Sequence, residues 1–149
     1  MVDLEIHWPQ QLPPEPLTQA VETLRRAGIE PTCRLQPTRR GAAEMSVLVL
    51  IGSTALEPLF KSMVDRLADD AYDLIRRLVG GLLGRRAEPQ APQSVVFEST
   101  ANGTQFVFTS GLPEEAFRQA IGLDPGEEPG RWTWDAGSKR WVRFERSSS

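Results

Sequence analysis

The sequence predicts an α+β fold with the element order β-α-β-β-α-β-β-α-β-β and one long amphipathic helix packed on a mixed or antiparallel sheet. Three segments carry this prediction. Residues 2–8 alternate apolar with polar side chains, residues 45–51 are apolar except for Ser46, and residues 55–80 repeat apolar residues every three or four positions. A period of two is typical of strands, and a period near 3.6 is typical of helices. The first six elements match the order of ferredoxin-like folds, so we expect a ferredoxin-like first half.

The N-terminal elements follow from local patterns. Val2, Leu4, Ile6 and Trp8 alternate with polar residues and predict a strand with one buried face. Apolar residues at helical spacing predict a helix over 15–27, and Gly28 follows as its C-cap. Residues 29–35 predict a second strand, and Pro31 favours a place at the edge of the sheet.

The middle of the chain carries the two strongest signals. Residues 45–51 are apolar on both faces of a strand, so we expect a central strand that is covered on both sides. The stripe over 55–80 predicts a helix of about seven turns, or roughly 38 Å at 1.5 Å per residue. Its length allows two arrangements. Either the helix lies diagonally across the sheet, or its C-terminal part over 74–83 overhangs the sheet and docks a partner.

The last third of the chain predicts two hairpins with a helix between them. Strands at 95–98 and 104–109 flank Asn102-Gly103, the dipeptide most typical of a two-residue hairpin turn. Residues 113–123 predict a short helix, and residues 132–134 and 141–144 predict a closing hairpin. We expect a single domain over 1–146, an internal Pro-rich linker over 85–93 and a disordered tail over 147–149.

Composition excludes several classes of function. The 149 residues include one His and one Cys, too few for an internal disulfide framework or a Cys/His zinc site, so we expect no metal and no cofactor. The net charge of −3 argues against nucleic-acid binding. The longest uncharged apolar stretch, 45–56, is too short to span a bilayer, and a lone Cys33 is typical of a reducing cytoplasm. We therefore expect a cytoplasmic protein without a membrane span.

One catalytic alternative stays open. Cys33 could act as a nucleophile with His7 as its base on a neighbouring strand, which would make the protein a Cys/His hydrolase. No local cysteine-protease signature surrounds Cys33. The sequence thus favours no catalytic residue, and a non-enzymatic protein is the first expectation.

Apolar surfaces offer better candidates for function. Trp132, Trp134 and Trp141 fall within ten residues on the closing hairpin, where they either close the core or grip a partner or ligand. Leu74, Leu78 and Leu82 lie on the part of the long helix that an overhang would expose. These six residues are the predicted interaction sites.

The chain resembles a group of small actinobacterial proteins that are similar to the effector-associated constant components of bacterial conflict systems. The shared features are Gly41-Ala42-Ala43-Glu44-Met45, a long helix at 56–86 that ends in Arg85-Arg86, the hairpin at 102–103, and the ending from Trp132 to Trp141. The segment 45–54 departs from the pattern. The resemblance implies a non-enzymatic accessory protein that accompanies effectors, and it carries over no functional residues.

The sequence therefore predicts an adaptor that acts by protein–protein interaction, with an effector or a second copy of itself as partner. If the partner is a second copy, the protein forms a homo-oligomer. The alternative, a small-ligand sensor, would have its pocket between the long helix and the sheet.

Overall fold

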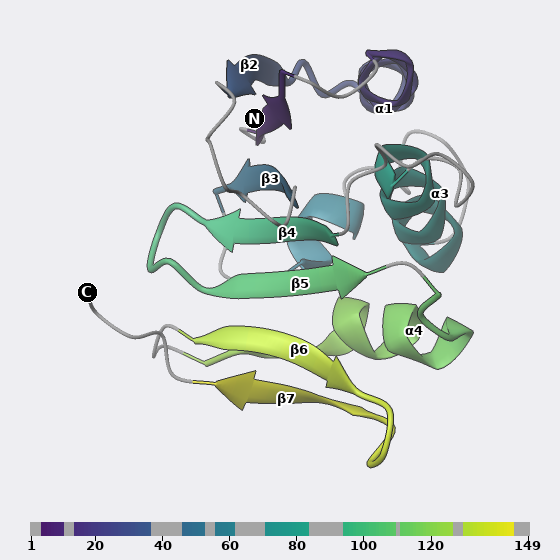
Figure 1. Cartoon of the computed structure of the whole chain (residues 1–149), viewed down its shortest axis with the longest axis vertical. Coiled ribbons are helices and arrows are strands. Elements are labelled where there is room, and N and C mark those ends of the chain that lie inside the picture. Colours follow the sequence, from purple (N-terminus) through teal and green to yellow (C-terminus); the bar gives the residue numbers. More distant parts are fainter. Residues whose placement is uncertain are drawn as a thin grey trace.

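A computed structural model describes residues 4–10, 14–36, 46–52, 56–61, 71–83, 94–109, 111–126 and 130–144. Its strands and helices alternate along the chain (Figure 1). They are β1 (Leu4–Pro9), α1 (Glu15–Arg26), β2 (Thr32–Gln36), β3 (Ser46–Ile51), α3 (Ala71–Leu83), β4 (Ser94–Ser99), β5 (Gln105–Thr109), α4 (Glu114–Gly122), β6 (Arg131–Asp135) and β7 (Arg140–Phe144). Residues 57–61 form a further helical segment.

The strands form one mixed sheet in the order β2-β1-β3-β4-β5-β6-β7. The pairs β1–β2, β3–β4 and β5–β6 are parallel, and each is joined through a helix. The pairs β1–β3, β4–β5 and β6–β7 are antiparallel. The predicted α+β class with a mixed sheet is confirmed, and β2 lies at an edge of the sheet, as Pro31 indicates.

The expectation of a ferredoxin-like first half is wrong. A split β-α-β arrangement places another strand between the two parallel strands of a unit. Here β1 pairs directly with β2, with Ile6 beside Cys33, and β3 occupies the other side of β1. Both arrangements share one order of elements along the chain. They differ in which strands pair with β1, and that pairing depends on contacts between residues far apart in the sequence.

The helices α1, α3 and α4 all lie on one face of the sheet, which we call the inner face (Figure 1). The pairings make β1 and β5 run in one direction and β3 in the other. The step from β1 to β2 goes towards one edge, whereas the steps from β3 to β4 and from β5 to β6 go towards the other. The crossover through α4 therefore has the opposite hand to the crossovers through α1 and α3. At least one of the three departs from the right-handed rule.

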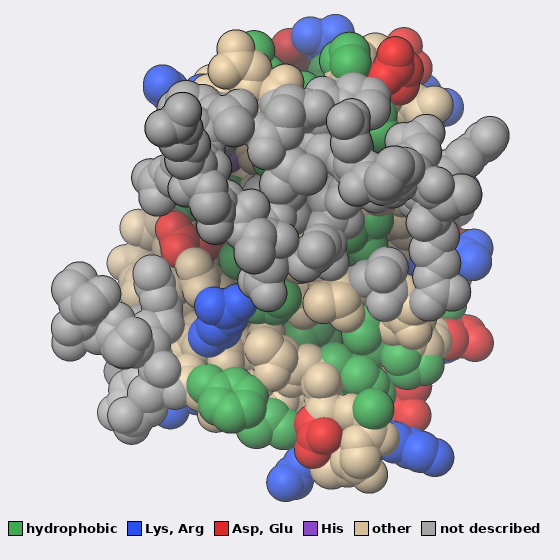
Figure 2. All heavy atoms as spheres, in the orientation of Figure 1, with side chains coloured by type: hydrophobic (Ala, Val, Ile, Leu, Met, Phe, Trp, Pro, Cys, Tyr) green, Lys and Arg blue, Asp and Glu red, His purple; other side chains and the backbone are tan. Residues whose placement is uncertain are grey.

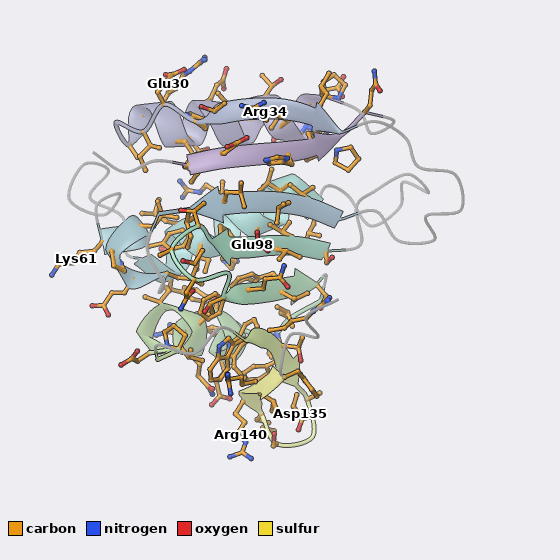
Figure 3. The ribbon with its side chains drawn as sticks, turned by 90° about the vertical axis from the view of Figure 1, so that its left-hand side faces the viewer. Glu30, Arg34, Lys61, Glu98, Asp135 and Arg140 are labelled. Carbon is orange, nitrogen blue, oxygen red and sulfur yellow. The ribbon has the colours of Figure 1, made fainter. Side chains whose placement is uncertain are left out.

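This difference in hand decides which surface stays free of helices. With the same hand throughout, α4 would lie on the opposite face from α1 and α3. Because it does not, the inner face carries the core. The largest fully buried side chains include Trp8, Phe60, Phe97, Phe106 and Phe108. We call the opposite side of the sheet the outer face, and no helix of the described segments lies on it (Figure 3).

The predicted long helix is seen in two parts. Residues 57–61 and Ala71–Leu83 are helical, while the residues between them lie outside those described, so its continuity stays a prediction. The expected linker over 85–93 and tail over 147–149 lie outside the described residues too. Within the described segments, no helix combines the length and the apolar character needed to cross a membrane.

The hairpin at Asn102-Gly103 is confirmed, but its turn is longer than two residues, because the Ser99 N–H donates to the Thr104 carbonyl across four intervening residues. Gly103 adopts a φ of 81°, a value that glycine accepts without strain. The Asn102 side chain accepts a hydrogen bond from the backbone N–H of Thr104 at 3.0 Å, and the Gly103 N–H donates to the Ser99 carbonyl at 2.8 Å. This turn fixes the register in which Val96 faces Val107.

Candidate interaction surface on the outer face of the sheet

The outer face is built of cross-strand rows that the strand register sets. Leu48 of β3 pairs with Val96 of β4, and Val96 pairs with Val107 of β5. On the last two strands Thr133 pairs with Val142. Side chains at paired positions point to the same face. The register thus assembles a row of side chains across the strands that is apolar except for one threonine, and we call it the apolar row. Its members are Leu48, Val96, Val107, Thr133 and Val142.

Polar side chains border this apolar row on both sides. On one side Glu98 pairs with Gln105, and the Gln105 amide donates a hydrogen bond to the Glu98 carboxylate at 2.6 Å. On the other side Asp135 pairs with Arg140. Figure 3 looks onto this face and shows Glu98 near its middle, with Asp135 and Arg140 at one end and Arg34 at the other. A partner would therefore meet an apolar band between polar margins, the arrangement typical of protein interfaces.

The members of the apolar row differ in how far they are exposed. Val96 and Val107 are 8% and 7% exposed, and Leu48 and Val142 are half-buried. Phe144 stands beside the row at the edge of the sheet and is 55% exposed. The sequence predicts that β3 needs cover on both faces. Among the described residues the helices lie on the inner face only, and the accessible apolar area of the outer face comes from Leu48, Val142 and Phe144.

A charged cluster ends the outer face at β1 and β2. The Glu5 carboxylate contacts Nε2 of His7 at 3.1 Å and also forms an ion pair with the Arg34 guanidinium. Both partners lie on the outer face, because His7 pairs with Arg34 across the two strands. His7 thus lies in a small cluster with Glu5 and Arg34 on the outer face.

The structure does not bring Cys33 and His7 together. Cys33 pairs with Ile6, which is fully buried on the inner face, whereas the His7 side chain points to the outer face. Partial burial raises the pKa of the Cys33 thiol; the Arg25 guanidinium lowers it in part, and Glu30 raises it further. A thiol with a raised pKa is a weaker nucleophile at neutral pH. The arrangement that the hydrolase alternative requires is absent.

The tryptophans of the closing hairpin mostly complete the core. Trp141 is 5% exposed, and its Nε1 donates a hydrogen bond to the Ala116 carbonyl of α4 at 2.8 Å. Trp134 packs edge-on against Trp141, with ring centres 6.0 Å apart, and Trp132 stacks on Phe106 at 6.5 Å. Trp132 and Trp134 are half-buried. Of the two alternatives for these residues, the structure favours closure of the core.

The overhang expected for 74–83 is not observed. Leu74, Leu78 and Leu82 are at most 2% exposed. They are covered because α3 packs between α1 and α4 on the inner face. Their role as interaction sites stays a prediction, although in this structure all three are buried in the core. The sequence-based alternative of a ligand pocket between the long helix and the sheet stays a prediction.

The outer-face residues Val107, Val142 and Phe144 were missed as candidates. A signal for them exists in the sequence. Residues 95–97 and 106–108 are apolar at consecutive positions, as residues 47–51 are, and such runs have apolar side chains on both faces of a strand. The side with no helix could not be identified from the sequence, because it depends on the hand of the α4 crossover.

A separate hollow lies between α4 and the turn that joins β6 to β7. It has a volume of about 500 Å³, and its lining includes Trp134, Leu112, Pro113, Glu115 and Lys139. Figure 2 shows hydrophobic side chains gathered over the lower part of the molecule, where Figure 1 places α4, β6 and β7. An aromatic wall with one carboxylate and one ammonium group suits a small polar ligand.

Comparison with known proteins gives no family assignment. No protein-family model matches the chain, no curated protein matches it, and no solved structure matches it. The resemblance to conflict-system components therefore rests on the sequence features described above and stays a prediction.

Proposed function

We propose that the protein is a non-enzymatic adaptor that binds a partner protein on the outer face of its sheet. The observation that carries the proposal is the apolar row, which lies on the face without a described helix and is bordered by polar side chains. Burying apolar area there would contribute roughly 25 cal/mol per Å² before the costs of association.

The separation of Cys33 from His7 supports a non-enzymatic role. The single histidine already contacts the Glu5 carboxylate, and the single cysteine faces the other side of the sheet. Neither residue is placed to activate the other, as a nucleophile–base pair must be. We propose a cytoplasmic accessory role in a bacterial conflict or defence system, with the sequence resemblance as its support.

Site-specific photo-cross-linking in the native cell tests this proposal. A photo-reactive phenylalanine analogue at Leu48, in the middle of the sheet, should capture a discrete protein adduct. The same analogue at Glu22, which is exposed on α1 behind the sheet, provides the matched control. Adding Leu50→Lys should abolish the Leu48 adduct, because it places a charge beside the apolar row, and adding Glu22→Lys should leave the adduct intact. Equal adducts from positions 48 and 22 would refute the proposal.

The hollow beside Trp134 supports a second candidate function, a small-ligand sensor. Its position between α4 and the β6–β7 turn differs from the pocket that the sequence suggests. A ligand that binds there should raise the Tm of the wild type. Ala136→Trp, at an exposed turn position in the lining, should fill the hollow and remove that shift. Ala101→Trp at the exposed β4–β5 turn is the control, and a shift that survives Ala136→Trp excludes this hollow.

A further inference from the structure

The two edge strands of the sheet differ in how they resist pairing with another chain. An edge strand presents unpaired backbone N–H and C=O groups, and proteins often block such strands with proline or charged residues. β2 is preceded directly by Pro31. β7 contains no proline, pairs only with β6 among the described strands, and ends in the exposed Phe144. The β7 edge is therefore the one available for strand addition.

The sequence of β7 is complementary to itself in one antiparallel register. Consider a twofold axis perpendicular to the sheet, which keeps the outer faces of two copies on the same side. Residues that pair across the axis must then point to the same face, so the axis passes through a residue and not between two residues. Within the middle of β7, this leaves registers centred on Trp141, Val142 or Arg143.

Charge distinguishes these registers. Centring on Arg143 places it opposite Arg143 of the second copy, and centring on Trp141 places Lys139 opposite Arg143 of the second copy. Like charges directly opposite one another destabilise a strand pair. Centring on Val142 avoids both contacts. It places Arg140 opposite Phe144 of the second copy, and Trp141 opposite Arg143 of the second copy.

The Val142 register places Arg140 opposite the exposed aromatic ring of Phe144 of the second copy. Arg140 and Phe144 are both exposed on the outer face, so each can contact its counterpart without rearranging the core. A guanidinium over an aromatic ring is a favourable contact, and the twofold axis produces each contact twice. Val142 meets its own copy on the axis, which adds an apolar contact between half-buried side chains.

We propose that the protein forms a homodimer by antiparallel pairing of β7 with β7 of a second copy, centred on Val142. The two sheets join into one, and the apolar rows of both copies meet at Val142. The dimer does not depend on the adaptor function, because its contacts use the strand edge and need no other protein. The dimer would present two outer faces, related by the twofold axis, to any partner that binds there.

Disulfide trapping tests the register directly. Residues that pair with themselves across antiparallel strands have Cα atoms about 4.5–5.5 Å apart, within the range that a disulfide bridges. In a Cys33→Ser background, Val142→Cys should give a covalent dimer on mild oxidation of the purified protein. Thr133→Cys lies on the same face one strand inward. It should give at least about tenfold less dimer, because its distance from the axis exceeds disulfide reach.

Charge variants at Phe144 separate this register from non-specific apolar association. Phe144→Lys places like charges opposite Arg140 twice and should raise the dimer dissociation constant by at least about tenfold. Phe144→Glu creates two opposite-charge pairs and should keep the constant within about threefold of the wild type. Light scattering after size exclusion gives the mass, circular dichroism verifies the fold, and Leu35→Lys on the β2 edge is the control.

Three results would overturn the dimer. The wild type could have the mass of a single chain at every concentration, Val142→Cys could cross-link no better than Thr133→Cys, or Phe144→Glu could dissociate the dimer as fully as Phe144→Lys. A protein that dimerises as described but gives no Leu48 adduct would contradict the adaptor proposal alone. A monomer that gives the adduct would contradict the dimer alone.

Discussion

Val107 and Phe108 are neighbours on β5, but they point to opposite faces of the sheet and meet very different surroundings. Phe108 lies 5.4 Å from Phe97, 5.9 Å from Phe117 and 5.1 Å from Trp141 between ring centres. Val107 lies in the apolar row, which polar residues border on both sides. The inner face thus packs aromatic rings against one another, whereas the outer face packs smaller side chains and leaves apolar area accessible at Leu48, Val142 and Phe144. The predictions below test that division, starting with the largest expected effect.

Truncation of the two neighbours should separate the faces most clearly. Phe108→Ala removes a fully buried ring that three aromatic residues contact, and we expect a loss of about 3–5 kcal/mol in the free energy of unfolding. Val107→Ala removes two methyl groups from a surface without helix cover and should cost about 1 kcal/mol. Urea denaturation of both variants measures the difference. Equal losses would mean that the outer face is as structural as the inner face.

Two tryptophans of the hairpin provide the next contrast. Trp141→Phe removes the hydrogen bond that the indole donates to the Ala116 carbonyl of α4, at a cost of about 0.5–1.5 kcal/mol. Trp132→Phe is the matched change, because Trp132 Nε1 has no hydrogen-bond partner among the described residues. We expect a smaller loss there, again from urea denaturation. A larger loss at Trp132 would show that stacking on Phe106 outweighs the hydrogen bond.

Local patterns predict the parts of this fold that local chemistry determines. The alternation in β1, the Asn102-Gly103 turn and the edge position of β2 beside Pro31 all follow from neighbours in sequence. The pairing of β1 with β2 and the hand of the α4 crossover depend on contacts between distant segments, which no local pattern encodes.

The candidate site depends on those same long-range features. Apolar residues on both faces of β3, β4 and β5 indicate that two surfaces need cover, but the sequence does not say which surface receives the helices. The predicted interaction residues, Leu74, Leu78 and Leu82, are apolar because they belong to the covered inner face. The strongest apolar patterns in the sequence therefore belong to the core. The residues of the candidate surface have a weaker apolar pattern than the core residues.

Cys33 offers a smaller test, at the margin of the inner face. Burial raises the pKa of its thiol, and the Arg25 guanidinium opposes this rise. At pH 8 we expect iodoacetamide to alkylate Cys33 more slowly than free cysteine, because less thiolate is present. Arg25→Gln should slow the reaction further, and Glu30→Gln should accelerate it. Alkylation of the wild type faster than free cysteine would contradict the raised pKa.

The smallest expected effect lies at the turn that holds β7 against β6. The Ser138 hydroxyl donates to the Asp135 carboxylate at 2.6 Å, and the Gly137 N–H donates to it at 3.2 Å. These hydrogen bonds lower the pKa of Asp135 below 3.8. A lowered pKa means that the folded state binds fewer protons than the unfolded state. The carboxylate therefore stabilises the fold fully well above pH 3.8, and this stability is lost as pH falls through the folded pKa.

Ser138→Ala removes the stronger cause of that shift. The variant should lose less stability than the wild type between about pH 5 and pH 2, so the two urea midpoints should converge as pH falls. The Asp135 side chain is fully exposed to solvent, so we expect a small difference that salt reduces further. Midpoints that stay parallel across this range would show that Asp135 holds the turn no better as a carboxylate than as a neutral acid. The β7 edge would then owe its position to Trp141 and the strand pairing with β6.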